Sequence, residues 1–508
     1  MLLYFVYFLL ALPIVAYLYV KWAYGYWDRK GVYTVEPVFP VGSFQDVQKG
    51  KISSFDFYKK FYSDIKKKGL KYGGLYLQLQ PTWIPVDLEL IKNVMSKDFG
   101  HFTDHGLYLN TKVDPISGSL FMLEGEKWRN HRAKLTPTFT SGKMKMMFHI
   151  LVTQSQALEK LLAEEAAKNG PVFIKELLAR FTTDIIGSVA FGIDCKCMIE
   201  PDNEFRIQGQ RAFGVGVKNK YKMLLRKYCS NKVLTLLRYK QTDDEVEKFF
   251  SDLVRSTIDY REKNGIYRKD FLQMLIELKN TGTVTDDEVM KKSTYGKPFL
   301  TIEEVTAHSL TFFLAGFETS STTMTFALVE LAQNQEIQDR LRAEILEVLE
   351  KYNGEMTYEA LKEMTYLEQT ILETLRKYPP IPILPRICTR TYEVDSNCTI
   401  TKGTAVQIPV QAVQHDPEIY PDPLKFDPDR FSKENSVGRS NFAFLSFGEG
   451  PRLCIGMRFG KVQSKCGLVT LLKNYRITLN EKTETPIKLV PHFITGVQGG
   501  LWLNLEKL

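Results

Sequence analysis

Apolar residues recur with a helical period along most of this 508-residue chain. Across residues 125–376, most windows repeat an apolar residue every three or four positions, which predicts a succession of helices. The alternation typical of strands is confined to short runs at 75–79, where Pro81 should end the strand, and at 406–408 and 501–503. No internal repeat or low-complexity tract breaks the pattern. The sequence therefore predicts a mainly α fold with a small β region, in one large domain.

Residues 2–20 form an unbroken run of nineteen apolar or aromatic residues, close to the roughly 20 that a helix needs to span a bilayer. A cleavable signal peptide is the alternative, but no Lys or Arg precedes the run and no clean small-x-small site follows it. Lys21, Arg29 and Lys30 follow the run, and positive charge on that side predicts that the rest of the chain faces the cytosol. We expect a transmembrane signal anchor at residues 1–21.

The next segment combines aromatic residues with prolines. Four aromatic side chains between Trp22 and Trp27 predict contact with a membrane interface. Pro37 and Pro40 then indicate a stiff, extended stretch of chain. The expected organisation is an interfacial segment and linker at residues 22–42, followed by a single large domain at 43–508.

The net charge of +8 is concentrated in one segment. Residues 206–240 contain ten Lys or Arg and no Asp or Glu, interleaved with leucines and other apolar residues. A solvated basic helix face is one interpretation. No nucleic-acid-binding motif accompanies the segment, so we expect no nucleic-acid partner. Contact with an anionic membrane surface fits the predicted anchor better.

The seven cysteines are odd in number and mostly scattered, which favours reduced thiols in a cytosol-facing protein over a disulfide framework. Cys195 and Cys197 form a lone C-x-C pair, a weak metal signal. Cys454 differs, because it lies in the segment Phe447–Gly456, FGEGPRLCIG, among three glycines, a proline and an arginine. Glycines let main-chain N–H groups gather around one atom, and a thiolate needs such donors or a cation. The segment predicts a thiolate held against a ligand.

A long apolar helical run at 306–331 contains one polar patch, Ala315-Gly316-Phe317-Glu318-Thr319. Spacings of four, three and four place His308, Phe312, Ala315 and Thr319 on one stripe, with Glu318 at its edge. Small residues beside an acid and an alcohol would leave space for a small ligand and a route for protons. The alternative is a core helix that kinks where Thr319 bonds back to a carbonyl. His308 is interpreted as a core or pocket-wall histidine.

Two further pairs have helical spacing. Glu373 and Arg376 are i,i+3 neighbours on a helix that prolines end, and Arg430 follows later in the chain. A surface ion pair is the simplest interpretation of the first two, but a carboxylate that holds two guanidiniums would form a buried clamp. Trp128 and Arg132 lie one turn apart, and their side chains are suitable donors for a cofactor carboxylate.

Together these residues resemble the cytochrome P-450 family, the haem-thiolate monooxygenases, from the predicted anchor to the C-terminus. Three motifs occur in the family's order: W-x-x-x-R, the A-G-x-E-T helix and E-x-x-R. The family's F-x-x-G-x-R-x-C-x-G signature is matched by Phe447, Gly450, Arg452, Cys454 and Gly456. Segments at 125–128, 136–143 and 376–380 are similar to the insect microsomal enzymes that clear plant toxins and insecticides.

The resemblance implies a haem b cofactor with Cys454 as its iron ligand. It implies that Gly316 makes room for dioxygen beside Ala315, that Glu318 and Thr319 relay protons, and that Phe312 lines the substrate pocket. Glu373, Arg376 and Arg430 would be a structural triad, with Asp429 where the family usually has glutamate. The residues implied to contact haem are Trp128, Arg132, Ala315, Gly316, Arg386, Phe447, Arg452 and Gly456.

The resemblance also implies partners and a location. Electrons would come from NADPH through a flavoprotein reductase, with cytochrome b5 as a second donor, and the enzyme would lie on the cytosolic face of the endoplasmic reticulum membrane. The substrate would be a lipophilic small molecule, and membrane lipid would be a further contact. Cations around Trp128 and after Cys454, Lys461 and Lys465 among them, predict a docking face for an acidic reductase.

Two other functions are compatible with a haem-thiolate site. A haem-thiolate isomerase or dehydratase would consume a peroxide and need no reductase, although such enzymes often lack the pair formed here by Glu318 and Thr319. A non-enzymatic haem sensor would need neither a proton relay nor a substrate access region positioned at the membrane. The monooxygenase is therefore the leading hypothesis.

Overall fold

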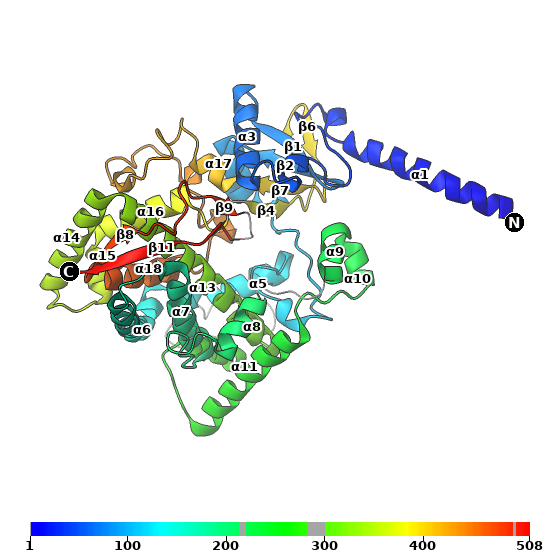
Figure 1. The fold of residues 1–508 in the computed structure, drawn as a ribbon. Helices are drawn as coiled ribbons and strands as arrows, with labels where there is room; N and C mark the ends of the chain where they lie inside the picture. Colours follow the sequence, from blue (N-terminus) through cyan, green and yellow to red (C-terminus); the bar gives the residue numbers. More distant parts are fainter. Residues whose placement is uncertain (1, 213–219, 283–299, 491–493) are drawn as a thin grey trace. The chain divides into compact units, whose positions relative to one another are not determined.

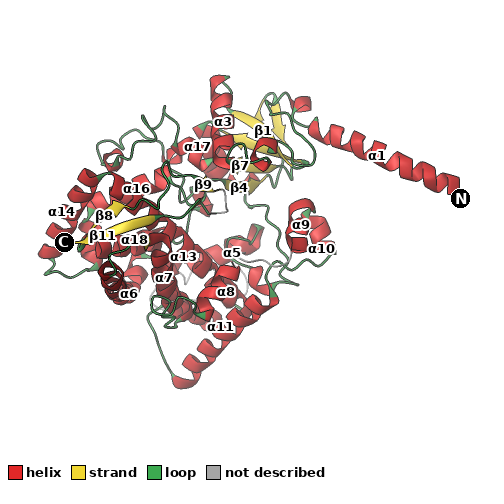
Figure 2. Cartoon of the chain, viewed as in Figure 1, coloured by secondary structure: helices red, strands yellow, loops and turns green. Residues whose placement is uncertain are grey.

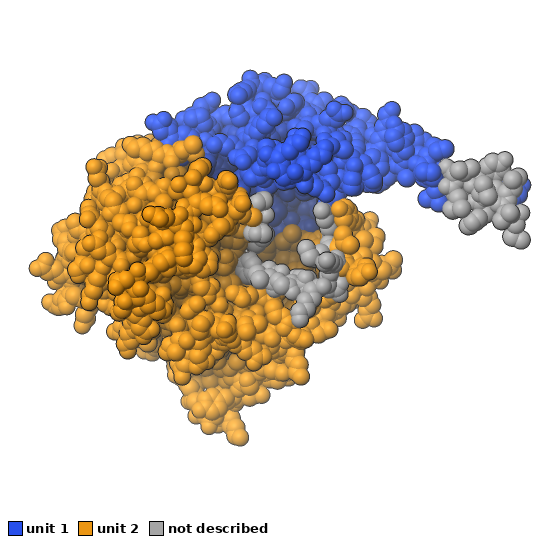
Figure 3. Space-filling model, in the orientation of Figure 1, with its two compact units in different colours: residues 1–106, 381–423, 439–453 blue, residues 107–380, 424–438, 454–508 orange. Residues whose placement is uncertain are grey.

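The computed structural model describes residues 2–212, 220–282, 300–490 and 494–508. Helices dominate and the strands are short (Figure 1; Figure 2), which confirms the predicted mainly α fold with a small β region. The chain divides into two compact units that interleave along the sequence (Figure 3). Unit 1 comprises residues 1–106, 381–423 and 439–453; unit 2 comprises residues 107–380, 424–438 and 454–508. The single domain expected at 43–508 stays a prediction.

Unit 1 is built on a four-stranded sheet in the order β1-β2-β7-β4, in which only β2 and β7 are parallel neighbours. The strands of unit 1 are β1 (Tyr72–Leu77), β2 (Gln80–Pro85), β4 (Leu384–Ile387), β5 (Tyr392–Asp395), β6 (Cys398–Ile400) and β7 (Ala405–Ile408). Its helices are α1 (Leu2–Tyr24), α2 (Gln45–Gln48), α3 (Ser54–Lys67), α4 (Leu88–Lys92) and α17 (Val410–Gln414). Strand β7 confirms the prediction at 406–408.

The strand predicted at 75–79 is wrong at its end. Strand β1 stops at Leu77, the chain turns at Gln78 with a φ of 51°, and Pro81 lies within β2 opposite Tyr76. Strand β2 pairs with β7 only beyond Pro81, so the missing N–H of this proline breaks no hydrogen bond to that neighbour. The proline therefore belongs to a strand that it was expected to terminate.

The chain after α1 enters the core of unit 1. Trp27 is fully buried, and its indole N–H donates to the carbonyl of Leu75 at 3.0 Å. The prediction that Trp27 belongs to a membrane-interface belt is therefore wrong, because the ring is packed and its N–H is satisfied inside the unit. Trp22, at the end of α1, is exposed. Within the described part of the chain, no helix has both the length and the apolar character that crossing a membrane requires.

Unit 2 is a group of helices around α13 (Ile302–Gln333), which packs against α7, α16 and α18. The other helices are α5 (Gly125–Leu135), α6 (Ser141–Ala167), α7 (Ile174–Ile186), α8 (Glu204–Ala212), α9 (Lys220–Tyr228), α10 (Asn231–Leu236), α11 (Asp244–Asn264), α12 (Phe271–Thr281), α14 (Gln335–Lys351), α15 (Tyr358–Glu363), α16 (Thr365–Lys377) and α18 (Met457–Leu472). Its strands are β3 (Val172–Phe173), β8 (Tyr475–Leu479), β9 (Leu489–Val490), β10 (Gly496–Val497) and β11 (Trp502–Lys507). Strand β11 confirms the prediction at 501–503.

Helix α13 begins at a capping box and is held by close packing. The Thr301 side chain accepts the N–H of Glu304, whose carboxylate accepts the N–H of Thr301 in return. A Cβ at Gly316 would lie 2.5 Å from Cδ1 of Ile186 on α7. The missing side chain at Gly316 therefore lets α7 approach α13, a packing role that the sequence did not predict.

The basic segment at 206–240 is partly neutralised by neighbouring acids. Arg206 is buried and pairs with Glu176 at 2.6 Å, and Lys222 pairs with Asp243 at 3.3 Å. Residues 213–219 of this segment lie outside the described residues. The remaining charge of this segment is therefore smaller than its composition indicates.

Candidate active site

Cys454 lies three residues before Met457, the first residue of α18 (Met457–Leu472), and is the one exposed cysteine among the seven. Packing among protein atoms raises the pKa of its thiol, while a hydrogen bond from the Gly456 N–H and the charge of Arg132 act in the opposite direction. The N-terminus of α18 adds the positive end of a helix dipole. The sulfur thus has a backbone donor and a nearby cation, the surroundings that were predicted for a thiolate ligand.

Arg132 and Trp128 lie one turn apart on α5. Trp128 is buried. Burial lowers the pKa of Arg132, and the Cys454 sulfur opposes that effect. Helix α5 therefore places a guanidinium near the sulfur and an indole one turn away. These are the two side chains of α5 that were expected to donate to a cofactor carboxylate.

The glycines before Cys454 belong to unit 1, and one of them is required sterically. Gly448 and Gly450 both have a φ of 72°, and a Cβ at Gly450 would lie 2.0 Å from the carbonyl oxygen of Met95. Phe447 is half-buried, with its ring centre 6.5 Å from that of Phe444. Gly450 is therefore needed for the close approach of this loop to Met95, and the predicted approach of Gly448 and Gly450 to a ligand stays a prediction.

Gly456 does not share this requirement. Its φ is −89°, which any residue can adopt, and a Cβ there would lie 3.9 Å from the ring of Phe139 in the described structure. The backbone at position 456 therefore does not need the conformational freedom of glycine. What Gly456 contributes is its N–H, which points at the Cys454 sulfur.

Two further arginines predicted to contact haem lie in unit 1 and differ in their partners. Arg386, on β4, is buried, and burial lowers its pKa to about 10; its Nε has no hydrogen-bond partner in the described part of the chain. Arg452 donates from Nε to the carbonyl of Thr103 at 3.0 Å and lies 3.6 Å from a carboxylate oxygen of Asp104. Arg386 is therefore a buried cation that suits a carboxylate ligand, whereas Arg452 already has an anionic neighbour.

The polar patch of α13 lies on the exposed stretch in the middle of the helix. Between residues 305 and 332, all of them described, Ala315 alone is exposed, and its neighbours Phe312 and Thr319 are half-buried. The Thr319 hydroxyl donates to the Ala315 carbonyl at 2.5 Å, which is the back-bonding alternative considered from the sequence. Phe312 packs its ring edge-on against Phe271, with centroids 4.2 Å apart.

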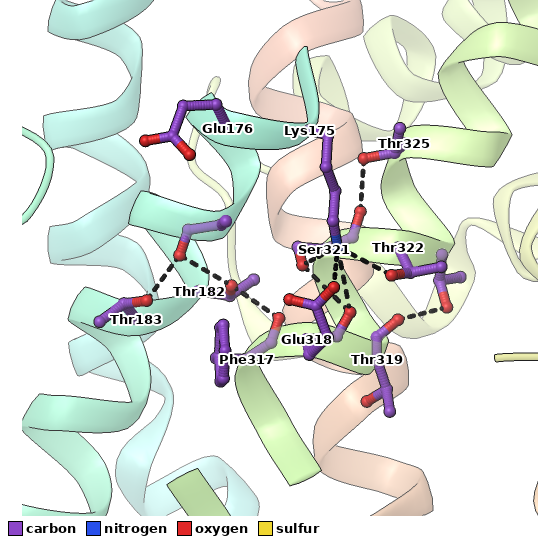
Figure 4. A network of polar contacts seen from close by, with 12 residues as sticks. Lys175, Glu176, Thr182, Thr183, Phe317, Glu318, Thr319, Ser321, Thr322 and Thr325 are labelled. Atoms are coloured by element: carbon purple, nitrogen blue, oxygen red, sulfur yellow. Dashed lines mark hydrogen bonds and ion pairs between the residues drawn. The ribbon is translucent and has the colours of Figure 1, made fainter. Parts of the chain in front are cut away.

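Glu318 has a partner that sequence reasoning missed. Its carboxylate lies 2.9 Å from the Nζ of Lys175, near the start of α7 (Figure 4). Lys175 lies three and seven residues before Leu178 and Thr182, both buried. A lysine on the apolar stripe of an amphipathic helix was the available signal.

The predicted carboxylate clamp is present and buried. Arg376 donates from Nε and from a terminal nitrogen to the two oxygens of Glu373 at 2.7 and 2.8 Å, and both side chains have zero exposure. Arg430 lies 3.5 Å from the same carboxylate, which also accepts the N–H of Asp427 at 3.0 Å. Burial raises the pKa of Glu373, and the Arg376 guanidinium opposes that rise. The three residues thus form the geometry expected of the triad.

One predicted docking residue is not on the surface. Lys465 is buried, and its Nζ donates to the carbonyl of Leu361 at 2.7 Å and pairs with Glu368 at 3.1 Å. Lys461 pairs with the same carboxylate at 2.7 Å. The prediction that Lys465 lies on an exposed docking face is therefore wrong, because the face of α18 that carries it packs inward. Arg458 is exposed.

The lone C-x-C pair meets a carboxylate inside unit 2. Asp184, Cys195 and Cys197 are all buried, with ligand atoms within 4.8 Å of one another. Both Asp184 oxygens already accept backbone N–H groups, those of Cys197 at 2.7 Å and Met198 at 3.0 Å. The carboxylate thus caps this turn, which explains its burial without a metal.

His308 is the buried end of a chain of titratable groups that links α13 to α5. Its Nε2 lies 2.8 Å from Nδ1 of His131, whose Nε2 lies 3.4 Å from the Glu304 carboxylate. When both rings are neutral, His308 can donate its Nε2–H to Nδ1 of His131, and His131 can donate its Nε2–H to the Glu304 carboxylate. Burial, together with the charge of nearby His131, lowers the pKa of His308 to about 3. The core histidine of the sequence prediction is thus part of a network.

This network predicts a loss of stability in mild acid. The unfolded imidazole binds a proton below its ordinary pKa of 6.5, whereas folded His308 resists protonation down to about 3, so stability is present above pH 6.5 and falls below it. The expected loss is about 2 kcal/mol between pH 6.5 and 5. Urea unfolding followed by tryptophan fluorescence should show this slope in the wild type and in the exposed-site control His149→Gln, and a smaller slope in His308→Gln. Equal slopes in all three proteins would refute the assignment.

An exposed cysteine with a backbone donor and a cation, in a mainly helical chain with an acid–alcohol pair, is the arrangement of the haem-thiolate proteins. The cytochrome P450 family model matches residues 36–501. The chain therefore belongs to the cytochrome P450 family, which implies a haem iron cofactor.

Its relatives are insect members of this family. The chain is similar to Cytochrome P450 6a2 of Drosophila melanogaster, with 42% identity over 512 aligned residues that cover 99% of each chain. It is also similar to Cytochrome P450 6A1 of Musca domestica, with 39% identity over 502 aligned residues covering 96% of this chain and 95% of the relative. These relatives support the predicted resemblance to insect enzymes.

Proposed function

We propose that this chain is a membrane-bound haem-thiolate monooxygenase that inserts one oxygen atom of O2 into lipophilic small molecules. The observation that carries the proposal is the exposed Cys454 sulfur just before α18, which has a hydrogen bond from the Gly456 N–H and is influenced by the charge of Arg132. Electrons are proposed to come from NADPH through a flavoprotein reductase, with cytochrome b5 as a second donor. The substrates are proposed to be xenobiotics such as plant toxins or insecticides, or endogenous lipids and hormones.

Within unit 2, the Cys454 sulfur suits the iron of haem, because a backbone N–H and a cation favour its anionic form. Within unit 1, the buried guanidinium of Arg386, whose Nε has no partner among the described residues, suits an anionic propionate. Arg132 and Trp128 are proposed to hold the propionates from α5, with Arg452 as a further cation. Bound haem supplies the iron that activates dioxygen and receives electrons one at a time.

The polar patch of α13 is proposed to supply protons. The Thr319 hydroxyl has both donor and acceptor capacity, and the Glu318 carboxylate next to it can accept and return a proton. Ala315 presents only a methyl group one turn before Thr319, whereas Ile186 of α7 fills the space beside Gly316. The chain's contribution here is to hold a hydroxyl at the half-exposed face of α13 and to keep an ionisable group one residue away.

The proposed location is the cytosolic face of the endoplasmic reticulum membrane. Its support is the apolar run at residues 2–20 followed by Lys21, Arg29 and Lys30. Residues 1–21 are proposed as the anchor and residues 22–42 as the connection to it. Such a location would place the enzyme beside lipophilic substrates and lipid.

The reconstituted reaction tests this function. Purified protein, a flavoprotein reductase and a panel of lipophilic substrates should give oxidised products only when NADPH and the reductase are both present. The control omits the reductase and supplies a fatty-acid hydroperoxide instead. A hydroperoxide rearranged at full rate, with no NADPH-dependent product from any substrate, would identify an isomerase or dehydratase and overturn the proposal.

A further inference from the structure

Lys175 makes an unusually complete set of contacts across two helices. Its Nζ, on α7, lies 2.9 Å from the Glu318 carboxylate and 2.8 Å from each of the hydroxyl oxygens of Ser321 and Thr322, all on α13 (Figure 4). A lysine ammonium has three N–H donors, and these three acceptors can take one each, while the Glu318 carbonyl lies farther away, at 3.4 Å. The side chain is therefore fixed in position, unlike a lysine in an ordinary surface ion pair.

The ion pair between Lys175 and Glu318 is partly exposed to solvent. The side chains of Lys175 and Glu318 are each 26% exposed, and desolvation lowers the pKa of Lys175 while Glu318 opposes that effect. An ion pair in this setting interacts more strongly than one at the surface. Water can still reach it, so protons from solvent can enter at this point.

The neighbouring acid, Glu176, already forms ion pairs with other residues. Glu176 follows Lys175 on α7, and its two carboxylate oxygens pair with Arg180 at 3.0 Å and with Arg206 at 2.6 Å. Among the described residues, Lys175 therefore forms its ion pair with Glu318, and Glu318 forms its ion pair with Lys175.

The acid and the alcohol of α13 thus have separate partners. The Glu318 carboxylate is turned toward α7 by Lys175, whereas the Thr319 hydroxyl bonds to the Ala315 carbonyl of its own helix. Ser321 and Thr322 hold Lys175 from the next turn of α13, so the ammonium cannot move without losing them. The orientation of the Glu318 carboxylate is consequently determined by Lys175, a residue of another helix.

We propose that Lys175 is a positioning residue for proton delivery: it fixes the orientation of the Glu318 side chain, so that protons enter from solvent at this ion pair. The inference rests on the proton-supplying role proposed above for Glu318 and Thr319. Lys175 itself touches neither substrate nor cofactor in this role. Its ammonium acts through the carboxylate that it orients.

Replacing Lys175 with methionine keeps the length of the side chain and removes its charge and its donors. An oriented acid–base group contributes roughly 10²–10⁴-fold to its step, and misplacement by 1 Å can cost about 10²-fold, so the rate of product formation should fall by up to about 10²-fold in Lys175→Met. More hydrogen peroxide should be released per NADPH, and the solvent deuterium isotope effect should rise. The spectrally measured affinity for substrate should stay unchanged, and Lys175→Arg should restore coupling.

The matched control is Lys145→Met, which removes a lysine from the exposed ion pair with Glu359 and should change none of these readouts. A readout without turnover is a double-mutant cycle on the urea midpoint. Lys175→Met with Glu318→Gln should shift the midpoint by less than the sum of the single shifts, because the two side chains interact directly. Should Lys175→Met fail to fold, Lys175→Gln removes the charge and retains N–H donors.

The role of Glu318 and the role of Lys175 can be separated. If Glu318→Gln leaves peroxide release unchanged, the proposed proton role of Glu318 is wrong whatever Lys175 does. If Glu318→Gln uncouples the enzyme but Lys175→Met does not, or if their effects on coupling simply multiply, the inference about Lys175 is overturned and the proposed function stands. A double variant no worse than Glu318→Gln alone would support the inference.

Discussion

Cys454→Ser is expected to abolish NADPH-dependent turnover and the spectrum of thiolate ligation. A hydroxyl of ordinary pKa cannot replace a thiolate as an anionic, electron-donating iron ligand. The Gly456 N–H and Arg132, which favour the anionic sulfur, would have no anion to stabilise. In the reduced, carbon monoxide-bound protein, the red-shifted Soret band should therefore be present in the wild type and absent in the variant.

The matched control for this prediction is Cys229→Ser. Cys229 is only partly exposed, and it lies in the basic segment at 206–240 rather than in the glycine loop. This variant should keep the red-shifted band and full turnover. A red-shifted band that survived Cys454→Ser would show that another residue binds the iron.

Glu373→Gln is expected to cause the largest loss of stability. The substitution would leave the guanidiniums of Arg376 and Arg430 without their anion, and Arg376 is fully buried. Removing one partner of a buried ion pair typically costs about 3–5 kcal/mol, a large part of the roughly 5–15 kcal/mol that keeps a domain folded. We expect a much lower urea midpoint and little haem-loaded protein.

Glu126→Gln provides the comparison for Glu373→Gln. Glu126 and Arg129 are also an i,i+3 glutamate–arginine pair, on α5, but both side chains are more than 60% exposed. This pair should contribute little to stability, because water screens it and competes for its donors. Equal destabilisation by the two substitutions would contradict the clamp.

The parts of the site that the sequence predicted are those that depend on local spacing or on a recognised motif. Glu373 and Arg376 are three residues apart on one helix, so their contact follows from helix geometry. The exposure of Cys454 and the steric need for glycine at Gly450 agree with the loop chemistry. The haem contacts of Trp128 and Arg386 stay predictions.

The parts that were missed depend on contacts between distant residues. Lys175 reaches Ser321 across 146 residues, and His131 meets His308 across 177. Periodicity identifies the faces of a helix, but it does not say which other helix covers each face. The error at Lys465 has the same origin, since spacing alone could not distinguish a buried face of α18 from an exposed one.

The most direct test of the monooxygenase is turnover under isotopically labelled dioxygen. In the reconstituted reaction with NADPH and reductase, the product should carry one labelled oxygen atom, and the other should appear in water. The Cys454→Ser protein should give no labelled product. A product that carries no label, or label that appears without NADPH, would contradict a monooxygenase that draws its oxygen from O2.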